Sequence, residues 1–109
     1  MQNASLGELE FVVLLVVSQT GDDAYGAAIR REVSDRTRRE YSVGAIYATL
    51  RRLEHKGLVK SFESEPLPVR GGRSRRYFVP TNAGRLAVRR AVQAKRSFWT
   101  NLTTAPGRR

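Results

Sequence analysis

The chain of 109 residues contains no cysteine. Disulfide bonds and thiolate metal sites are therefore excluded, and the absence fits a protein that stays in a reducing cytoplasm. The only histidine, His55, has no paired carboxylate or nucleophile at helical spacing, and Glu54 is its sequence neighbour rather than a partner on the same helix face. The sequence therefore indicates neither catalysis nor a metal site, and no cofactor is expected.

A long apolar run and an early positive charge are also missing. The apolar run from Phe11 to Val17 has seven residues, which is too short to cross a bilayer. No Lys or Arg precedes Arg30, so the basic region that opens a secretory signal is absent. We therefore expect no membrane association and a cytoplasmic location.

Positive charge, in contrast, is present in excess and is unevenly distributed. The formal net charge is +10. Residues 1–40 carry five Lys and Arg against seven Asp and Glu, whereas residues 41–109 carry fifteen against three. Concentrated cations attract a polyanion and release its counterions on binding, and DNA is the commonest such partner. Solubility alone would also explain a basic chain, but it does not require the charge to cluster.

Capping residues and hydrophobic spacing predict two helices in the acidic half. The segment Ser5 to Glu8 fits a capping box at the start of a helix over about residues 6–19. The β-branched residues in that segment are also compatible with a buried strand. Asp22 and Asp23 can cap a second helix over residues 24–36.

The basic half predicts a helix, a hairpin and a final helix. Ser42 is a good N-cap for the third helix and Gly57 a good stop. Strands are expected over residues 58–62 and 76–79. Thr81 can cap a last helix that continues to about Leu102. This order predicts a mainly α-helical winged helix-turn-helix with a small β-hairpin over residues 1–80, a C-terminal dimerisation helix over 81–104, and a frayed tail over 105–109.

The third helix carries the residues expected to contact DNA. Its apolar positions place Val43, Ile46, Leu50 and Leu53 on one buried arc. The opposite arc is expected to hold small residues, a hydroxyl and two cations, namely Ala45, Ala48, Thr49, Arg52 and Lys56. Small residues permit close approach to base edges, and the longer side chains reach bases or phosphates.

Tyr47 lies at the margin of the buried arc of the third helix. It is either a core-edge aromatic with its hydroxyl in water or a phosphate ligand. Arg51 is similarly ambiguous. With Ser42 at the N-cap, these residues complete the predicted reading head.

The connection between the predicted strands is rich in arginine and glycine. It contains Arg70, Arg73 and Arg75 around Gly71 and Gly72. Guanidinium groups on such a loop can bind phosphates or enter a narrow minor groove. A merely solvated charged loop is the alternative, but closely spaced like charges repel one another until a counter-charge arrives.

The last predicted helix has a broader apolar face than a small domain needs. Its apolar residues cover about half of the helix circumference, so the surplus is expected to bury against a second copy of the chain. The residues assigned to this interface, or to a ligand bound there, are Leu9, Val13, Val92, Phe98, Trp99 and Leu102.

Several ordered fragments together resemble one family. The fragments are Leu6-Gly-Glu-Leu-Glu10, Ala24-Tyr-Gly26, Ser42-Val-Gly-Ala-Ile-Tyr47, Leu53-Glu54, Lys56-Gly-Leu-Val59, Arg70-Gly-Gly-Arg73, Arg76-Tyr77 and Thr81-Asn-Ala-Gly84. In this order they resemble the PadR family of bacterial transcriptional regulators, in its short form with one C-terminal helix. The resemblance covers nearly the whole chain, although many relatives have Pro where this chain has Ala48.

The resemblance implies a winged-helix homodimer that binds a palindromic double-stranded DNA operator, usually as a repressor, and releases it when a small molecule binds. It implies that the third helix enters the major groove and that the first and last helices form the dimer. Some short members bind planar hydrophobic molecules through a Trp of the last helix, and Trp99 occupies a comparable place. Trp99 as an interface anchor without a ligand is the alternative. A basic winged-helix module that binds RNA or a protein partner is the competing function.

Overall fold

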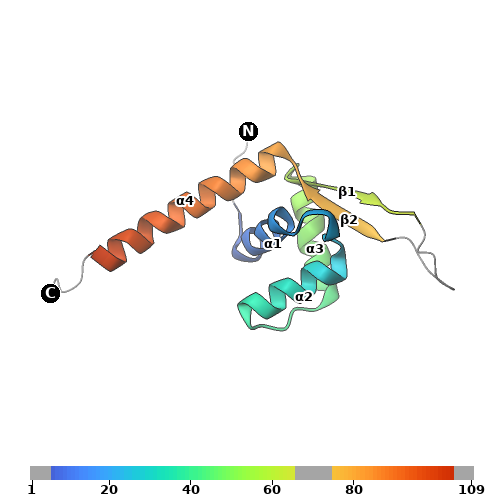
Figure 1. Ribbon diagram of the computed structural model, residues 1–109, viewed down its shortest axis with the longest axis horizontal. Coiled ribbons are helices and arrows are strands. Elements are labelled where there is room, and N and C mark those ends of the chain that lie inside the picture. Colours follow the sequence, from blue (N-terminus) through green and yellow to red (C-terminus); the bar gives the residue numbers. More distant parts are fainter. Residues whose placement is uncertain (1–5, 66–74, 105–109) are drawn as a thin grey trace.

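The computed structural model describes residues 6–65 and 75–104, with side chains as far as Trp99. It consists of helices α1 (Glu8–Thr20), α2 (Gly26–Thr37), α3 (Val43–His55) and α4 (Asn82–Thr104), a short 3-10 turn (Gly21–Asp23), and strands β1 (Val59–Glu63) and β2 (Arg76–Pro80). Figure 1 shows α1 between α4 and α3, with α4 extending away from the hairpin. The expected fold class, a mainly helical winged helix-turn-helix, is confirmed.

The first segment is a helix rather than a strand. Its N-cap is Gly7, and the Glu10 carboxylate accepts a hydrogen bond from the Gly7 N–H at 2.9 Å. Glu10 therefore fills the role that the sequence assigned to Glu8, and the helix begins two residues later than expected. The valines of this segment are tolerated in a helix because tertiary burial outweighs their weaker helix propensity.

The second helix also begins later than the sequence predicts. Asp22 and Asp23 lie in the 3-10 turn. Ala24 and Tyr25 then run beside the hairpin, because the Phe78 N–H donates to the Ala24 carbonyl at 2.8 Å and Tyr25 forms a bridge with Tyr77. This extended pair ties the start of α2 to β2 and delays the helix to Gly26.

The predicted capping residues of α3 and α4 are confirmed. The Ser42 hydroxyl accepts from the Ala45 N–H at 3.0 Å, and α3 is followed by Gly57 at a φ of 78°. The Thr81 hydroxyl accepts from the Gly84 N–H at 3.0 Å and donates to the Gly57 carbonyl at 2.7 Å. The start of β1, after α3, and the end of β2, before α4, are therefore fixed to each other and to these helices.

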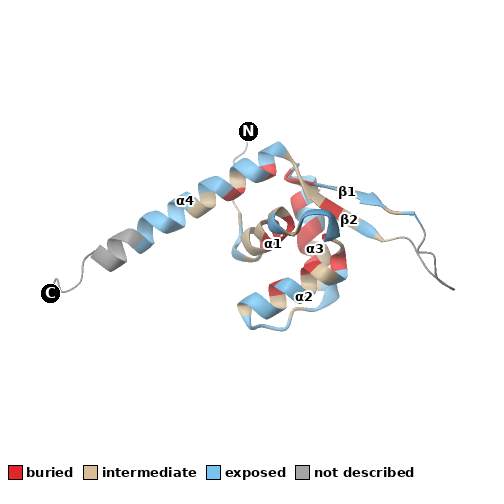
Figure 2. Ribbon diagram, in the orientation of Figure 1, coloured by how far each residue is buried: buried red, intermediate tan, exposed pale blue. Residues whose placement is uncertain are grey.

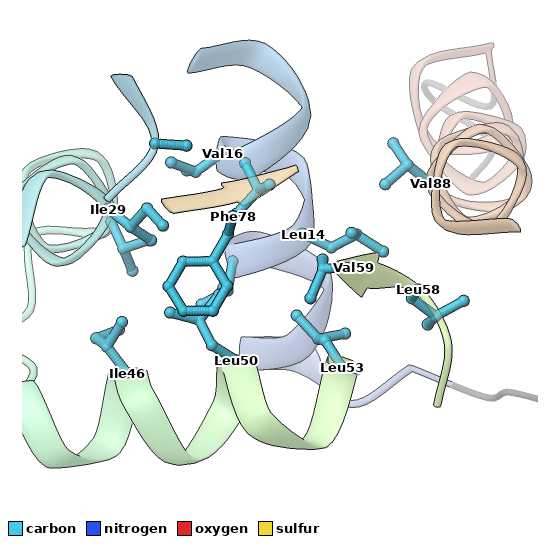
Figure 3. Close-up of a cluster of buried hydrophobic side chains, with 14 residues drawn as sticks. Leu14, Val16, Ile29, Ile46, Leu50, Leu53, Leu58, Val59, Phe78 and Val88 are labelled. Carbon is cyan, nitrogen blue, oxygen red and sulfur yellow. The ribbon is translucent and has the colours of Figure 1, made fainter. Parts of the chain in front are cut away.

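The hairpin is antiparallel, with Val59 opposite Pro80 and Phe62 opposite Tyr77. Phe78 points from β2 into the core, where it lies among residues from α1, α2 and α3 (Figure 3). The buried hydrophobic residues come from every helix and both strands: Val13, Leu14, Val16, Val17, Ala24, Ile29, Val33, Ile46, Leu50, Leu53, Leu58, Val59, Phe78 and Val88. One apolar cluster thus holds α3 against the rest of the domain.

Burial falls off along α4 (Figure 2). Val88 is buried, whereas Phe98 and Trp99 are 74% and 65% exposed. Among the described residues, no helix is long and apolar enough to cross a bilayer.

Candidate nucleic-acid interface

The outer face of α3 is a stripe of small and basic residues. Gly44, Arg51 and His55 are exposed and Ala48 is half-buried. Their spacing of four, three and four residues places them on one side of a helix, opposite the buried Leu50 and its neighbours. We call Gly44, Ala48, Arg51 and His55 the outer stripe.

The outer stripe is rotated from the face that the sequence predicts. Thr49, expected on the outer arc, is fully buried, and Val43, expected in the buried arc, is 53% exposed. The Thr49 hydroxyl donates to the Ala45 carbonyl at 2.8 Å, so its burial leaves no unsatisfied donor. The prediction that Thr49 faces DNA is therefore wrong. Val43 is exposed because it lies in the first turn of α3, at the edge of the core.

Arg52 and Lys56 face α1 rather than pointing straight outward. Lys56 Nζ lies 2.7 Å from Glu10 Oε1, and Arg52 Nε lies 3.3 Å from Glu10 Oε2. The Glu10 side chain is only 9% exposed, whereas that of Arg52 is 56% exposed. Both cations therefore lie at the border between the α1–α3 contact and the outer stripe.

The pKa of Glu10 is held below its usual value. Burial, the largest single effect, raises this pKa by disfavouring the charged carboxylate. The hydrogen bonds from Lys56, the Gly7 N–H and Arg52, together with the charge of Lys56, outweigh that effect. Glu10 is therefore ionised at neutral pH and compensates these two cations of α3.

A shallow, open depression of about 670 Å³ lies over the second half of α3. Its lining is mostly charged: Ala48, Arg51, Arg52, Glu54, His55 and Lys56. It thus joins the outer stripe to the two cations held by Glu10. Sequence reasoning missed Gly44 and His55 and left Arg51 open. Gly44, Arg51 and His55 are spaced from Ala48 as residues on one face of a helix are, and the sequence shows this spacing. The assignment of Val43 to the buried arc hid it, because that assignment rotated the predicted outer face.

The predicted residues at the start of α3 divide into small side chains and a packed aromatic. Ala45 is half-buried, and Ser42 is exposed with its hydroxyl engaged as the cap. Tyr47 is half-buried and packs edge-on against Phe78. The Tyr47 hydroxyl lies so close to Gly26 that any Cβ at position 26 would overlap it. Packing therefore accounts for the Tyr47 ring, while contact of its hydroxyl with a phosphate is still a prediction.

Of the predicted hairpin arginines, Arg70 and Arg73 lie outside the described residues. The Arg75 guanidinium packs over the Tyr25 ring at 4.1 Å from its centroid, and the backbone N–H of Arg75 donates to the Ser64 hydroxyl at 3.0 Å. This cation–π contact fixes Arg75 at the base of the hairpin, near the start of α2.

The residues assigned to a dimer or ligand interface have different environments. Val13 is fully buried in the subunit's own core, so it has no surface left for a second chain. The prediction that Val13 lies in a dimer or ligand interface is therefore wrong. Leu9 and Val92 are half-buried. Phe98 and Trp99 are exposed. The side chain of Leu102 lies outside the described residues.

Within residues 6–65 and 75–104, no group of three or more His, Cys, Asp or Glu side chains gathers as metal ligands would. The arrangement on α3 instead offers hydrogen-bond donors and positive charge beside small side chains. Such a surface can approach an anionic polymer closely and hydrogen-bond to it.

Comparison with known proteins finds relatives of one family. The sequence profile of the "Transcriptional regulator PadR-like family" matches residues 13–90. A PadR family transcription regulator from Clostridium difficile R20291 is 27% identical, with a TM-score of 0.71 over 93% of this chain and 100% of that one. A padr family transcriptional regulator from Eggerthella lenta DSM 2243 is 25% identical, with a TM-score of 0.68 over 92% and 87%.

A PadR-like transcriptional regulator from Bacillus cereus ATCC 14579 shares the fold, with a TM-score of 0.73 at 21% identity over 91% of both chains. No curated protein sequence matches the chain.

Proposed function

The chain belongs to the PadR-like family of transcriptional regulators, and we propose that it acts as a homodimeric repressor that reads a palindromic operator through the outer stripe of α3. Family membership confirms the resemblance recognised in the sequence. It makes the protein a DNA-binding transcriptional regulator and not an enzyme. The repressor role, the symmetric operator and the residues that read it belong to the proposal.

The observation that carries the proposal is the composition of the outer stripe. Gly44 and Ala48 add little bulk, so the helix backbone can come close to base edges in a major groove. Arg51 and His55 follow on the same line, and among the described residues Arg51 forms no ion pair. An unpaired, exposed guanidinium beside small residues is suited to bidentate recognition of a guanine.

Other predicted residues surround this stripe and are proposed to contact DNA at its border. Those on and next to α3 are Ser42, Ala45, Tyr47, Arg52 and Lys56, and those of the hairpin are Arg70, Arg73 and Arg75. Phosphate contacts from the other border residues would fix the orientation of α3, while the stripe and the neighbouring Arg52 read the sequence.

The proposed homodimer uses α1 and α4. The exposed Phe98 and Trp99 support this, because two large aromatic side chains on a helix that extends from the domain favour burial against a second chain. Leu9 and Val92 would extend the contact. A small hydrophobic effector bound beside Trp99, and a cytoplasmic location, complete the proposal.

The test is a titration of the purified protein against two duplexes of equal length at two salt concentrations. One duplex is the region upstream of the regulator's own gene, and the other is a scrambled version of it. Binding that is about 1,000-fold tighter to the upstream duplex supports the proposal. If the upstream duplex bound no more tightly than the scrambled duplex, with a steep salt dependence, the proposal that the protein recognises an operator would be rejected. RNA or a protein would then become the partner to test.

The role of the outer stripe is tested in the same titration with Arg51→Ala. We expect the upstream duplex to lose about 1–3 kcal/mol of binding free energy and the scrambled duplex to lose much less. Arg31→Ala, at an exposed position on α2, is the matched control for removal of one arginine. An equal loss on both duplexes would make Arg51 a phosphate contact.

A further inference from the structure

Arg52 is held from two sides before any DNA is bound. Its Nε donates to Glu10 Oε2 at 3.3 Å, and its Nη2 donates to the Thr49 hydroxyl at 3.3 Å. Glu10 belongs to α1 and Thr49 to the preceding turn of α3, so the two acceptors come from different helices. A guanidinium group that donates from two of its three nitrogens to acceptors on different helices has its plane fixed.

The two acceptors are themselves fixed. Glu10 accepts from Lys56 Nζ at 2.7 Å and from the Gly7 N–H at 2.9 Å. Thr49 is fully buried, and its hydroxyl proton is committed to the Ala45 carbonyl. The hydroxyl oxygen therefore presents a lone pair to Arg52, and neither acceptor can rotate without losing a hydrogen bond.

The contacts of Arg52 leave its outer edge available. The side chain is 56% exposed and lines the depression that also contains Ala48, Arg51 and His55. An arginine has five N–H donors, and the contacts with Glu10 and Thr49 use the inner ones. The Nη1 group lies on the remaining side of the guanidinium.

We propose that Glu10 and Thr49 are positioning residues that orient Arg52 for sequence recognition by α3. This inference rests on the function proposed above. Ordering a long arginine side chain costs rotamer entropy, and a site that has ordered it beforehand avoids most of that cost on binding. Glu10 also repels phosphates, so it favours presentation of Arg52 to a base over its capture by the DNA backbone.

The proposal gives Thr49 a role that its burial allows. It does not touch DNA, yet its hydroxyl helps to direct a side chain that does. It also gives the α1–α3 ion pairs a role beyond stability, because a residue of α1, one of the two helices of the proposed dimer, influences the recognition helix.

The test measures how strongly each variant distinguishes the operator from a scrambled duplex. Arg52→Ala is expected to lower the ratio of the two affinities about tenfold or more. Glu10→Gln is expected to lower it about three- to tenfold. The same variant should bind the scrambled duplex more tightly, with a salt slope steeper by about one, because a negative charge that repels phosphates has been removed.

Two comparisons separate positioning from stability. Glu8→Gln removes the same charge from the same turn of α1 at an exposed site, and the affinity ratio should not change. In the double variant Glu10→Gln, Arg52→Ala, the ratio should equal that of Arg52→Ala alone, because Glu10 has then lost the side chain that it orients. Thr49→Val replaces the hydroxyl by a methyl group of similar size, so Arg52 loses this acceptor; it provides a second test, with an expected loss of about threefold.

The possible results have distinct meanings. A wild-type protein that does not distinguish the duplexes would reject the proposed function itself. A selective wild type, with Glu10→Gln and Thr49→Val both melting at lower temperature but equally selective, would show that the contacts are only structural. Full additivity of the Glu10 and Arg52 effects on the ratio would also overturn the inference.

Discussion

Removal of the Lys56 ammonium group should destabilise the protein in a pH-dependent way. Lys56 Nζ lies 2.7 Å from Glu10 Oε1, and the carboxylate side chain is only 9% exposed. Lys56→Met keeps most of the aliphatic stem and removes the charge. A hydrogen bond to a charged group contributes about 1.5–3 kcal/mol. Because Arg52 and the Gly7 N–H still compensate Glu10 in the variant, we expect a loss of about 1.5–2 kcal/mol at pH 7.

The sign of the pH dependence follows from Glu10. Its pKa is lower in the folded protein than the ordinary value, through Lys56, Gly7 and Arg52 acting against burial. The ionised carboxylate therefore stabilises the fold above the unfolded pKa, which is about 4.3, and this stability is lost as the pH falls through the folded pKa. The difference between wild type and Lys56→Met should be constant from pH 8 to about 6 and shrink as the pH falls below about 4.

Urea unfolding followed by circular dichroism at fixed protein concentration measures this difference at each pH. Lys60→Met, at an exposed position of β1, is the control for loss of one lysine and should change stability by less than about 0.5 kcal/mol. A loss in Lys56→Met that is no larger than in the control, or one that is the same at pH 7 and pH 3.5, would refute the account of the Glu10 cluster.

Three further predictions concern packing, DNA binding and assembly. Gly26→Ala should destabilise the fold by about 1–3 kcal/mol in urea unfolding, because the new methyl group overlaps the Tyr47 hydroxyl. Gly44→Ala, whose methyl group would meet only the Ser42 hydroxyl at an ordinary contact distance of 4.0 Å, should not destabilise it, and equal losses would contradict the close packing at Gly26. Arg73→Ala should weaken binding to all duplexes and reduce the salt slope by about one; a loss confined to the operator would instead assign it to base reading. Trp99→Ala should weaken the dimer in sedimentation at micromolar concentration, and unchanged sedimentation would remove this residue from the interface.

Local signals in the sequence were sufficient for most of the fold. Ser42 and Thr81 cap their helices through hydrogen bonds that involve neighbours three residues away. Such contacts depend on short-range spacing, which a sequence displays directly. The start of α2 was harder to predict because Ala24 and Tyr25 are held by β2, more than fifty residues later in the chain.

The orientation of α3 was the main failure, and its cause is physical. A threonine inside a helix can satisfy its hydroxyl with the carbonyl four residues earlier, as Thr49 does with Ala45. Burial then has no hydrogen-bonding penalty, and hydropathy alone does not reveal it. Val43 shows the opposite error: it was predicted to be buried and is exposed, because an apolar residue in a first helical turn can lie beyond the edge of the core.

The ion pairs of Glu10 could not be predicted from local patterns. They join α1 to residues of α3 that are 42 and 46 positions away in the sequence. Arg52 and Lys56 were predicted to contact DNA because they are basic residues on the third helix. Their shared partner became evident only from the packing of α1 against α3.

The outer stripe of α3 is proposed to face a DNA groove, and a cleaving label on the helix tests this directly. The chain has no cysteine, so His55→Cys gives a single attachment site for a DNA-cleaving iron chelate at the end of the stripe. Gln93→Cys, at an exposed position on α4, provides the comparison. On bound operator, the label at position 55 should cleave at two symmetric centres separated by about one helical turn, or a multiple of it. Absence of cleavage from position 55, with binding intact, or stronger cleavage from position 93, would contradict the account.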